Sequence, residues 1–392
     1  MKSIQSNNYI GGNNWKYSDK VYYKLTGKSV QSHYNPKIPI IVKEIPNLLH
    51  HKKVFGIFWN TPTFKDTDCN YLFHLYDTNH VDYVVSTSSG NTVESMARAI
   101  KIYNEERNKN LYAILLVPEL SAYKVSQSAI ENNTHIKYVV LRNSTLDNTR
   151  EFANKLILYL SHSFKVIHAD SDIKTAAYAQ IGVILKNNNL MRDDVCYVQT
   201  VSGGVGATGL IESAIQFKSN PEVLVAQPCN GKTAPIVDAL NAHLSGNDPI
   251  SIFTDVNYNT PYIEPTLGSN KPIYAIKKFI EWRENGGRII PVGVLEDKLN
   301  LYKEKILKSL IQANIYSNKD IGLKLYDFEK SGFIAFVGAI TAANHIEANN
   351  IVVNFTGRYP DPELIIPRPA SPHFKYKATK SFKDFTSKLN LY

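Results

Sequence analysis

Short apolar runs rich in β-branched and aromatic residues alternate with longer stretches of helical pattern along most of this chain. The runs that we expect to form strands are Val54–Phe58, Asp82–Ser86, Tyr112–Val117, Tyr138–Leu141, Cys196–Thr200, Glu222–Ala226, Ile289–Val292 and Ile351–Asn354. The stretches that we expect to be helical are Thr92–Glu106, Asn148–Ser161, Ile173–Asn187, Leu210–Phe217 and Ile273–Glu284. Strands that feed helices in this order form parallel sheets flanked by helices on both faces. The pattern therefore predicts an α/β fold.

The chain has 392 residues, which is more than a domain with a single hydrophobic core usually contains, so we expect two domains that share a cleft. We predict a lead-in over 1–50 that packs on the core, a smaller domain over 51–170 and a larger domain over 171–367. Residues 368–392 are expected to form an irregular C-terminal tail.

Composition limits the class of protein. The net charge of +9 is spread along the chain, whereas nucleic-acid binders more often concentrate it, so we expect no nucleic-acid partner. The three cysteines are far apart and form no metal-binding or disulfide pattern. The N-terminal residues show no signal-peptide pattern, and the most apolar run, Gly332 to Ala343, is too short to span a bilayer. We expect a cytoplasmic protein with no metal and no membrane partner.

The first candidate site is Thr61-Pro62-Thr63-Phe64-Lys65-Asp66, here called the lysine turn, which follows an expected strand. A helix should begin after the proline, with Asp66 in its first turn. Phe64 and Trp59 would partly shield Lys65, which suits an amine that forms a Schiff base. A lysine taken by itself is far more often an ordinary surface residue.

The second candidate is Thr87-Ser88-Ser89-Gly90-Asn91-Thr92, the serine loop, between an expected strand and an expected helix. Its hydroxyls, amide and backbone N–H groups at a helix start could bind a carboxylate or phosphate. Plain capping of the helix by Ser or Thr is an equally good interpretation of this segment alone.

The third candidate is Ser202-Gly203-Gly204-Val205-Gly206-Ala207, the glycine loop, which also lies between a strand and a helix. Glycines let successive N–H groups converge on a phosphate, although a hinge or a close-packed turn would use them too.

The fourth candidate is Asn354-Phe355-Thr356-Gly357-Arg358, after an apolar strand. The Thr356 hydroxyl could face the floor of a cleft, but such a threonine is more often a satisfied turn residue.

Together, the order and spacing of these four motifs resemble the fold-type II pyridoxal 5′-phosphate (PLP) enzymes of the tryptophan synthase β superfamily. Thr63-Phe64-Lys65-Asp66 looks like the family's lysine motif, and Ser89-Gly90-Asn91-Thr92, which follows Lys65 by 24 residues, looks like its substrate loop. The glycine loop is similar to its phosphate-binding loop. Asn354-Phe355-Thr356-Gly357 is similar to the Thr-Gly segment of the threonine synthase and cysteate synthase branch.

The resemblance implies a two-domain fold with PLP in the interdomain cleft and a role for each motif. Lys65 would hold PLP as a Schiff base and then remove the substrate's α-proton. The substrate carboxylate would be bound by Thr87, Ser88, Ser89, Gly90, Asn91 and Thr92, and Asn91 would also reach the cofactor. The phosphate would be bound by Ser202, Gly203, Gly204, Val205, Gly206 and Ala207. Thr356 would hydrogen-bond the pyridine nitrogen.

A neutral hydroxyl at that nitrogen makes the ring a weaker electron sink than a carboxylate would, which favours β-replacement or β-elimination over transamination. The likeness to cysteate synthase implies a substrate such as O-phosphoserine, with sulfite or another small nucleophile, and by analogy a homodimer. A threonine-synthase-like reaction on O-phosphohomoserine is the alternative. Thr67-Asp68 and Gly357-Arg358 depart from the threonine synthase pattern, which leaves both reactants open. Further candidates for anion contacts are Arg98, Lys232 and Arg358.

Two other interpretations remain open. Gly204-Val205-Gly206-Ala207-Thr208-Gly209 fits the GxGxxG fingerprint of NAD(P)-dependent oxidoreductases. Such a site needs Asp or Glu at the end of the next strand, where this chain has Gln227-Pro228. The third interpretation is a non-catalytic binding protein that keeps the fold and has lost turnover.

Overall fold

The computed structural model of this chain describes residues 8–29, 36–76, 80–168, 171–229, 234–255, 264, 267, 269, 272–356, 368–378 and 381–390. The chain divides into two compact units. The larger unit comprises Met1–Ser29, Asn35–Thr67 and Ser171–Ile366, and the smaller unit comprises Val30–Tyr34, Asp68–Asp170 and Pro367–Tyr392.

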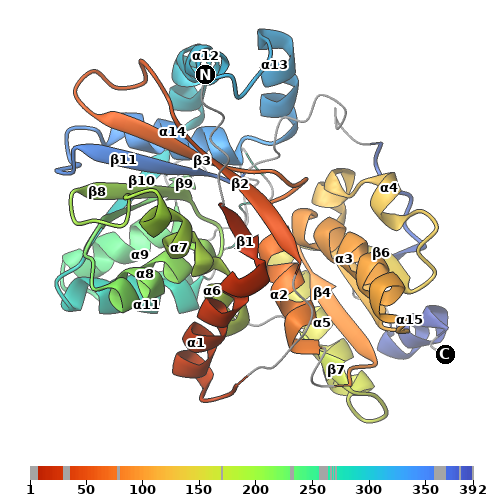
Figure 1. Cartoon of the computed structure of the whole chain (residues 1–392). Helices are drawn as coiled ribbons and strands as arrows, with labels where there is room; N and C mark the ends of the chain where they lie inside the picture. Colours follow the sequence, from red (N-terminus) through yellow and green to blue (C-terminus); the bar gives the residue numbers. More distant parts are fainter. Residues whose placement is uncertain are drawn as a thin grey trace. The chain divides into compact units, whose positions relative to one another are not determined.

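The larger unit is built on a seven-stranded sheet with the order β1-β2-β3-β11-β8-β9-β10 (Figure 1). The strands are β1 (Tyr9–Gly11), β2 (Lys37–Glu44), β3 (Lys53–Trp59), β8 (Val195–Thr200), β9 (Glu222–Pro228), β10 (Arg288–Val294) and β11 (Asn350–Phe355). β1 and β2 pair antiparallel to their neighbours, and the other five strands run parallel. Because consecutive side chains of a strand point to opposite faces, the apolar runs of the parallel strands are buried on both sides.

Helices cover both faces of this sheet. The α-helices of the larger unit are α1 (Trp15–Thr26), α6 (Ser171–Tyr178), α7 (Gln180–Asn187), α8 (Val205–Phe217), α9 (Pro235–Leu244), α10 (Ile252–Asp255), α11 (Ile273–Glu284), α12 (Glu296–Gln312), α13 (Lys319–Phe328) and α14 (Ser331–Thr341); a 3₁₀ turn, η1, spans Gly12–Asn14. The apolar run noted in the sequence is α14, a buried helix that contacts the four strands β8 to β11. Figure 1 shows α14 on one side of these strands and α8, α9 and α11 on the other.

The smaller unit is built on a five-stranded parallel sheet with the order β12-β6-β5-β4-β7. The strands are β4 (Tyr83–Thr87), β5 (Tyr112–Pro118), β6 (Ile136–Arg142), β7 (Val166–Ile167) and β12 (Phe374–Lys377). Its helices are α3 (Asn91–Arg107), α4 (Gln127–Ile130), α5 (Leu146–Leu160) and α15 (Phe382–Leu389), with a 3₁₀ turn, η2, over Glu119–Lys124; α2 (Asp66–Tyr76) contains the division between the units. The prediction of an α/β fold with parallel sheets flanked by helices is confirmed.

The expectation of an irregular tail was wrong for the residues that the structure describes. β12 pairs with β6, and the N–H of Tyr138 donates to His373 Nδ1 at 3.0 Å. Phe385 and Leu389 of α15 are completely buried in the core of the smaller unit. Burying such side chains stabilises the fold by about 1.5–3 kcal/mol each, enough to order a short helix.

The division of the chain also differs from the expected boundaries. Lys65 belongs to the larger unit, because β3 pairs with β11 in the same sheet. The expected lead-in contributes β1, α1 and β2, so its sheet strands are integral to the larger unit. The helix predicted over Ile173–Asn187 is divided into α6 and α7.

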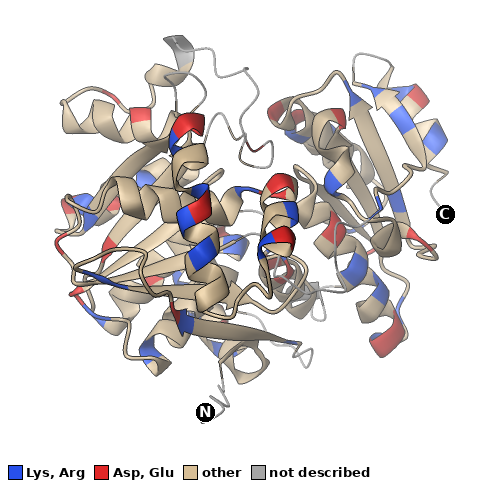
Figure 2. Ribbon diagram, turned by 90° about the horizontal axis from the view of Figure 1, so that it is seen from above, with Lys and Arg blue, Asp and Glu red and all other residues tan. Residues whose placement is uncertain are grey.

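Charged side chains are distributed rather than gathered. Figure 2 shows Lys and Arg alternating with Asp and Glu over the helices and strands visible in that view. Within the described part of the chain, no group of three or more His, Cys, Asp or Glu residues could hold a metal ion. The described helices include none whose length and apolar character would let it cross a membrane.

Candidate active site

Three of the four motifs meet at one edge of the seven-stranded sheet. Asn354 of β11 lies between Ile57 of β3 and Gln199 of β8, and all three strands run parallel. Their carboxyl ends therefore share an edge, from which the lysine turn, the glycine loop and Thr356 continue. Ligands of open parallel sheets bind at the carboxyl ends of the strands.

The lysine turn is held by hydrogen bonds within itself. Thr61 Oγ1 donates to the carboxylate of Asp66. The N–H of Lys65 donates to Thr63 Oγ1 at 3.3 Å, and the N–H of Asp66 donates to the Thr63 carbonyl at 3.0 Å. α2 begins at Asp66, as predicted, and a carboxylate in the first helical turn is favoured by the helix dipole. These bonds fix the backbone of Lys65.

The Lys65 amine is held by a tyrosine. The side chain is half-buried, and Nζ donates to the hydroxyl of Tyr178 at 3.2 Å. Tyr178 ends α6 and is 0% exposed. Its ring stacks on Phe64 with centroids 4.3 Å apart, and Trp59 packs edge-on against Phe64 at 4.6 Å. The amine therefore points into a cluster of aromatic rings of its own unit.

A buried polar network fixes the far end of this ring cluster. Trp59 Nε1 donates to Asn354 Oδ1 at 2.6 Å, and Asn354 Nδ2 donates to Gln199 Oε1 at 3.3 Å. The Tyr197 hydroxyl donates to the same Gln199 oxygen at 3.0 Å. Burial raises the pKa of the Tyr197 phenol, so it stays a neutral donor. These hydrogen bonds hold the side chains of Trp59, Asn354 and Gln199 in place.

Sequence reasoning missed Tyr178 and Gln199, and it named Asn354 only as part of the fourth motif. Tyr178 lies in a stretch that was expected to be helical, and it drew no prediction of its own. Gln199 and Asn354 did carry a signal, because each is a polar residue near the end of an otherwise apolar strand. A buried amide in such a strand needs a partner, and here each is the other's partner.

The glycine loop presents open backbone donors. Gly204 precedes α8 with a φ of 74°, a left-handed conformation that favours glycine. No side chain caps this helix start. Among the described residues, no hydrogen-bond acceptor is found for the N–H groups of Val205 and Gly206. Among the described residues, a Cβ added to Gly203 would meet only Val205 Cγ2, at 3.8 Å. Such a helix start suits a phosphate or carboxylate.

Two further polar side chains are those of Ser202, the first residue of this loop, and Gln227 of the neighbouring strand β9. Ser202 Oγ accepts a hydrogen bond from the N–H of Ser269 at 3.2 Å. Gln227, near the end of β9, accepts the N–H of Ile236 with its Oε1 at 2.8 Å. Its Nε2 is buried and has no partner in the part of the chain that the structure describes. An unpaired buried donor costs about 1–3 kcal/mol, which a ligand or a water molecule would recover.

Thr356 follows β11 directly and is half-buried. Its hydroxyl makes no hydrogen bond within the described ranges, so it can bond a ligand at this edge. Gly357, the next residue of the motif, lies outside the described residues, as do Lys232 and Arg358.

The serine loop lies in the smaller unit, at the carboxyl end of β4. Ser88 Oγ accepts the N–H of Thr92 at 3.1 Å. Gly90 precedes α3 with a φ of 112°, and a Cβ there would lie 2.7 Å from Lys124 Cβ. The buried side chains of the loop are those of Ser88, Ser89, Asn91 and Thr92. The prediction that this loop faces Lys65 stays a prediction.

Arg98, proposed from the sequence as an anion contact, is already engaged. Its guanidinium pairs with the carboxylate of Glu94, which is 1% exposed and also accepts the N–H of Ser126 at 3.1 Å. This arrangement ties α3 to the segment before α4 and gives Arg98 a structural partner.

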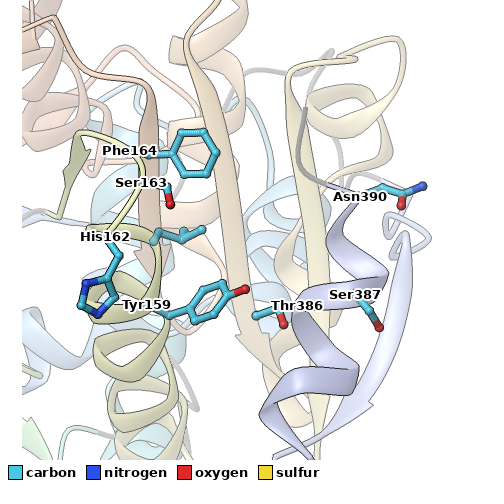
Figure 3. Close-up of a pocket in the computed structure, with 8 residues that line it drawn as sticks. Tyr159, His162, Ser163, Phe164, Thr386, Ser387 and Asn390 are labelled. Carbon is cyan, nitrogen blue, oxygen red and sulfur yellow. The ribbon is translucent and has the colours of Figure 1, made fainter.

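A cavity of about 490 Å³ opens in the smaller unit between the end of α5 and α15 (Figure 3). Its lining residues are Tyr159, Leu160, His162, Ser163, Phe164, Thr386, Ser387 and Asn390. The lining includes no motif residue and no Lys, Arg, Asp or Glu side chain. Figure 3 shows the Tyr159 ring pointing toward Thr386. We assign this cavity no part in the site.

No protein-family model matches this sequence, and no curated protein matches it. Solved structures do resemble it. A PLP-dependent aspartate racemase is 17% identical, with a TM-score of 0.57 over 89% of this chain and 96% of that one. The serine racemase from Dictyostelium discoideum is 18% identical, with a TM-score of 0.55 over 88% of this chain and 98% of that one. The diaminopropionate ammonia-lyase from Escherichia coli is 14% identical, with a TM-score of 0.57 over 90% and 91%. The chain thus has the fold of fold-type II PLP enzymes.

Proposed function

We propose that this chain is a PLP-dependent enzyme that carries out β-elimination or β-replacement on an amino acid with a good leaving group. The observation that carries the proposal is the Lys65 amine, 3.2 Å from Tyr178, at the strand edge that it shares with the glycine loop. Structures of the same fold include enzymes described as a PLP-dependent racemase and an ammonia-lyase, which supports PLP chemistry here.

The residues at this edge fit the chemical groups of PLP. An aldehyde needs a nearby amine, which Lys65 offers. A phosphate needs converging N–H groups, which the start of α8 offers, since no side chain of the described residues caps it. The partnerless Nε2 of Gln227 is a further donor on the neighbouring strand. The pyridine nitrogen needs one hydrogen-bond partner, for which the Thr356 hydroxyl is unoccupied within the described ranges.

When bound, PLP withdraws electrons from the α-carbon of an amino-acid substrate and so makes its α-proton acidic. Lys65 Nζ, once released, would take that proton, since it is the basic nitrogen nearest the reacting atoms. The N–H groups of the glycine loop would hold the phosphate in place. The neutral hydroxyl of Thr356 would not stabilise a protonated ring nitrogen, which favours loss of a β-substituent over transamination. The hydroxyls of Ser89 and Thr92 would bind the substrate carboxylate.

For the substrate, we propose a phosphorylated amino acid, with O-phosphoserine as the first choice and O-phosphohomoserine as the second. The likeness of the lysine, glycine and Thr-Gly motifs to cysteate synthase and threonine synthase supports this choice. A small nucleophile such as sulfite would complete a replacement reaction. The net charge of +9 is compatible with anionic reactants.

The first test is the absorbance spectrum of the purified protein with added PLP. We expect a band near the edge of the visible range that borohydride abolishes. Reduction should leave the pyridoxyl group covalently attached to the peptide that contains Lys65. Lys65→Ala should lose both the band and turnover, because its amine is the covalent anchor. A PLP band that persists in Lys65→Ala would show that another residue is the anchor.

The second test separates the competing interpretations. Phosphate release from O-phosphoserine or O-phosphohomoserine would support the proposed reaction. A PLP band without turnover of any activated serine or homoserine ester would favour the non-catalytic protein. Binding of NAD(P) without a PLP band would favour the oxidoreductase, although β9 ends in Gln227-Pro228 and supplies no carboxylate for the ribose.

A further inference from the structure

We infer that Tyr178 is a positioning residue for Lys65: its hydroxyl holds the lysine nitrogen in the orientation from which it bonds to PLP. The inference rests on the proposed function and adds to it a residue that none of the four motifs contains. The inference concerns the rate at which the Lys65 amine bonds to the PLP aldehyde, whereas the proposed function concerns whether this bond forms at all.

The geometry gives the phenol control over the amine. A lysine side chain has four rotatable bonds, so a free amine samples many positions, and fixing it costs up to about 2 kcal/mol of conformational entropy. Here the Lys65 side chain is held at both ends. The lysine turn fixes its backbone N–H, and the Tyr178 hydroxyl accepts a hydrogen bond from Nζ at 3.2 Å. Nζ also lies 5.1 Å from the ring centroids of Phe64 and Tyr178, close enough for a cation–π attraction.

Tyr178 is itself fixed by the packing of α6 against α8, the helix that begins at the glycine loop. α6, which ends at Tyr178, packs against α8, which begins at the glycine loop. Thr175 of α6 and Thr208 of α8 share a buried hydrogen bond of 2.8 Å. Ser213 of α8 donates to the carbonyl of Ala179, the residue after Tyr178. The phenol and the loop that would bind the phosphate therefore belong to one packed pair of helices.

A phenol suits this task better than a carboxylate would. To attack, the neutral amine uses its lone pair to form the bond to the aldehyde carbon. The two N–H protons and the aldehyde oxygen then leave as one water molecule. A carboxylate partner would favour the ammonium form, which has no lone pair to offer. A neutral phenol can accept a hydrogen bond from the ammonium or donate one to the amine, so it orients the nitrogen in both states.

The chain offers a variant that removes the hydroxyl alone. Tyr178→Phe keeps the ring that stacks on Phe64 and removes the hydroxyl to which Nζ donates. Tyr316→Phe is a matched control, since the Tyr316 hydroxyl is also buried and has no partner within the described residues. Phe64→Leu is a second variant, which removes the ring stack that fixes the Tyr178 phenol and so weakens the hold of its hydroxyl on Nζ.

The experiment adds increasing PLP to cofactor-free protein and follows the rise of the absorbance band by stopped flow. In Tyr178→Phe, we expect the limiting rate of covalent attachment to fall about fivefold to tenfold, the effect of one lost hydrogen bond. The PLP concentration that gives half of this rate should stay unchanged, because the glycine loop is intact. Tyr316→Phe should match the wild type in both values.

The outcomes are separable. A Tyr178→Phe protein that matches the wild type in limiting rate, while Phe64→Leu is slowed, would overturn the inference and leave only a packing role for the ring. A wild-type protein that shows no band at any PLP concentration would instead refute the proposed function. If Tyr178→Phe does not fold, Phe64→Leu decides: the inference requires a slower limiting rate, and an unchanged rate overturns it.

Discussion

Two helices of this chain begin after a glycine with positive φ at the carboxyl end of a parallel strand: α3 after β4 and α8 after β8. At α3, the hydroxyl of Ser88 accepts the N–H of Thr92, and the loop is buried. At α8, no side chain caps the helix, and the hydroxyl of Ser202 is engaged by the N–H of Ser269 instead. The smaller unit thus satisfies one N–H at its helix start, that of Thr92, with a serine of its own chain, while no side chain of the described residues does so at α8.

This difference separates two kinds of anion binding. An open helix start can bind a phosphate through several N–H groups at once, as proposed for the glycine loop. A helix start that is already capped has fewer backbone donors left. A carboxylate bound by the serine loop would therefore depend more on the hydroxyls of Ser89 and Thr92 than on the N–H of Thr92. The predictions below test each side of this contrast.

The largest effect is expected at Gly204. Gly204→Ala should lower the free energy of unfolding by about 3 kcal/mol. About 1–2 kcal/mol of this comes from the left-handed φ of 74°. The rest comes from overpacking, because the new Cβ would lie 2.4 Å from Ala275 Cβ. Denaturant unfolding measures the change.

A double variant tests the steric part of this effect. Ala275→Gly removes the methyl group that the new Cβ would meet, at a cost of about 1 kcal/mol in the helix α11. The double variant Gly204→Ala with Ala275→Gly should lose less free energy of unfolding than the two single variants lose together. Strict additivity would mean that the new Cβ at position 204 does not contact Ala275, so that the loop accommodates an alanine without overpacking.

The next effect concerns ligand binding at the open helix start. Gly203→Val should fold normally, because within the described ranges a Cβ at this position meets only Val205 Cγ2, at 3.8 Å. Its side chain would fill the space beside the open N–H groups, so PLP affinity should fall at least about tenfold, or about 1.4 kcal/mol. Titration with PLP, followed by absorbance, measures this change.

Pyridoxal, which lacks the phosphate, is the control ligand. It should bind wild type and Gly203→Val alike, because the change affects only the phosphate site. An equal loss for both ligands would show that Gly203 lies elsewhere in the site, and an unchanged PLP affinity would remove the glycine loop from the proposal.

The sequence predicted the strands and the lysine turn well, because both depend on local patterns. All eight predicted strands are present, and α2 begins at Asp66 as expected. Strand neighbours depend on contacts between distant segments, so the pairing of β3 with β11, which places Lys65 in the larger unit, was not predicted. Tyr178 was missed for the same reason, since only the packing of α6 brings its hydroxyl to Nζ.

The tail shows a different kind of failure, because its pattern was present and was overlooked. Phe382, Phe385 and Leu389 follow helical spacing, and the last two are completely buried. Lysine is frequent in this segment, and lysine commonly covers the outer face of an amphipathic helix. For this segment, hydrophobic periodicity predicts the secondary structure better than composition does.

The smallest effect is expected at the capped helix start. Ser88→Ala should lower the free energy of unfolding by about 1 kcal/mol, because the N–H of Thr92 loses its acceptor. Hydrogen exchange, followed by mass spectrometry, should become faster in the peptide that contains Thr92. Ser128→Ala is the control in the same unit, since Ser128 is exposed and, among the described residues, its hydroxyl bonds only the side chain of Ser126, at 3.4 Å. Exchange that is equally slow in wild type and Ser88→Ala would mean that the start of α3 does not depend on its serine. The contrast between the two helix starts would then rest on the openness of α8 alone.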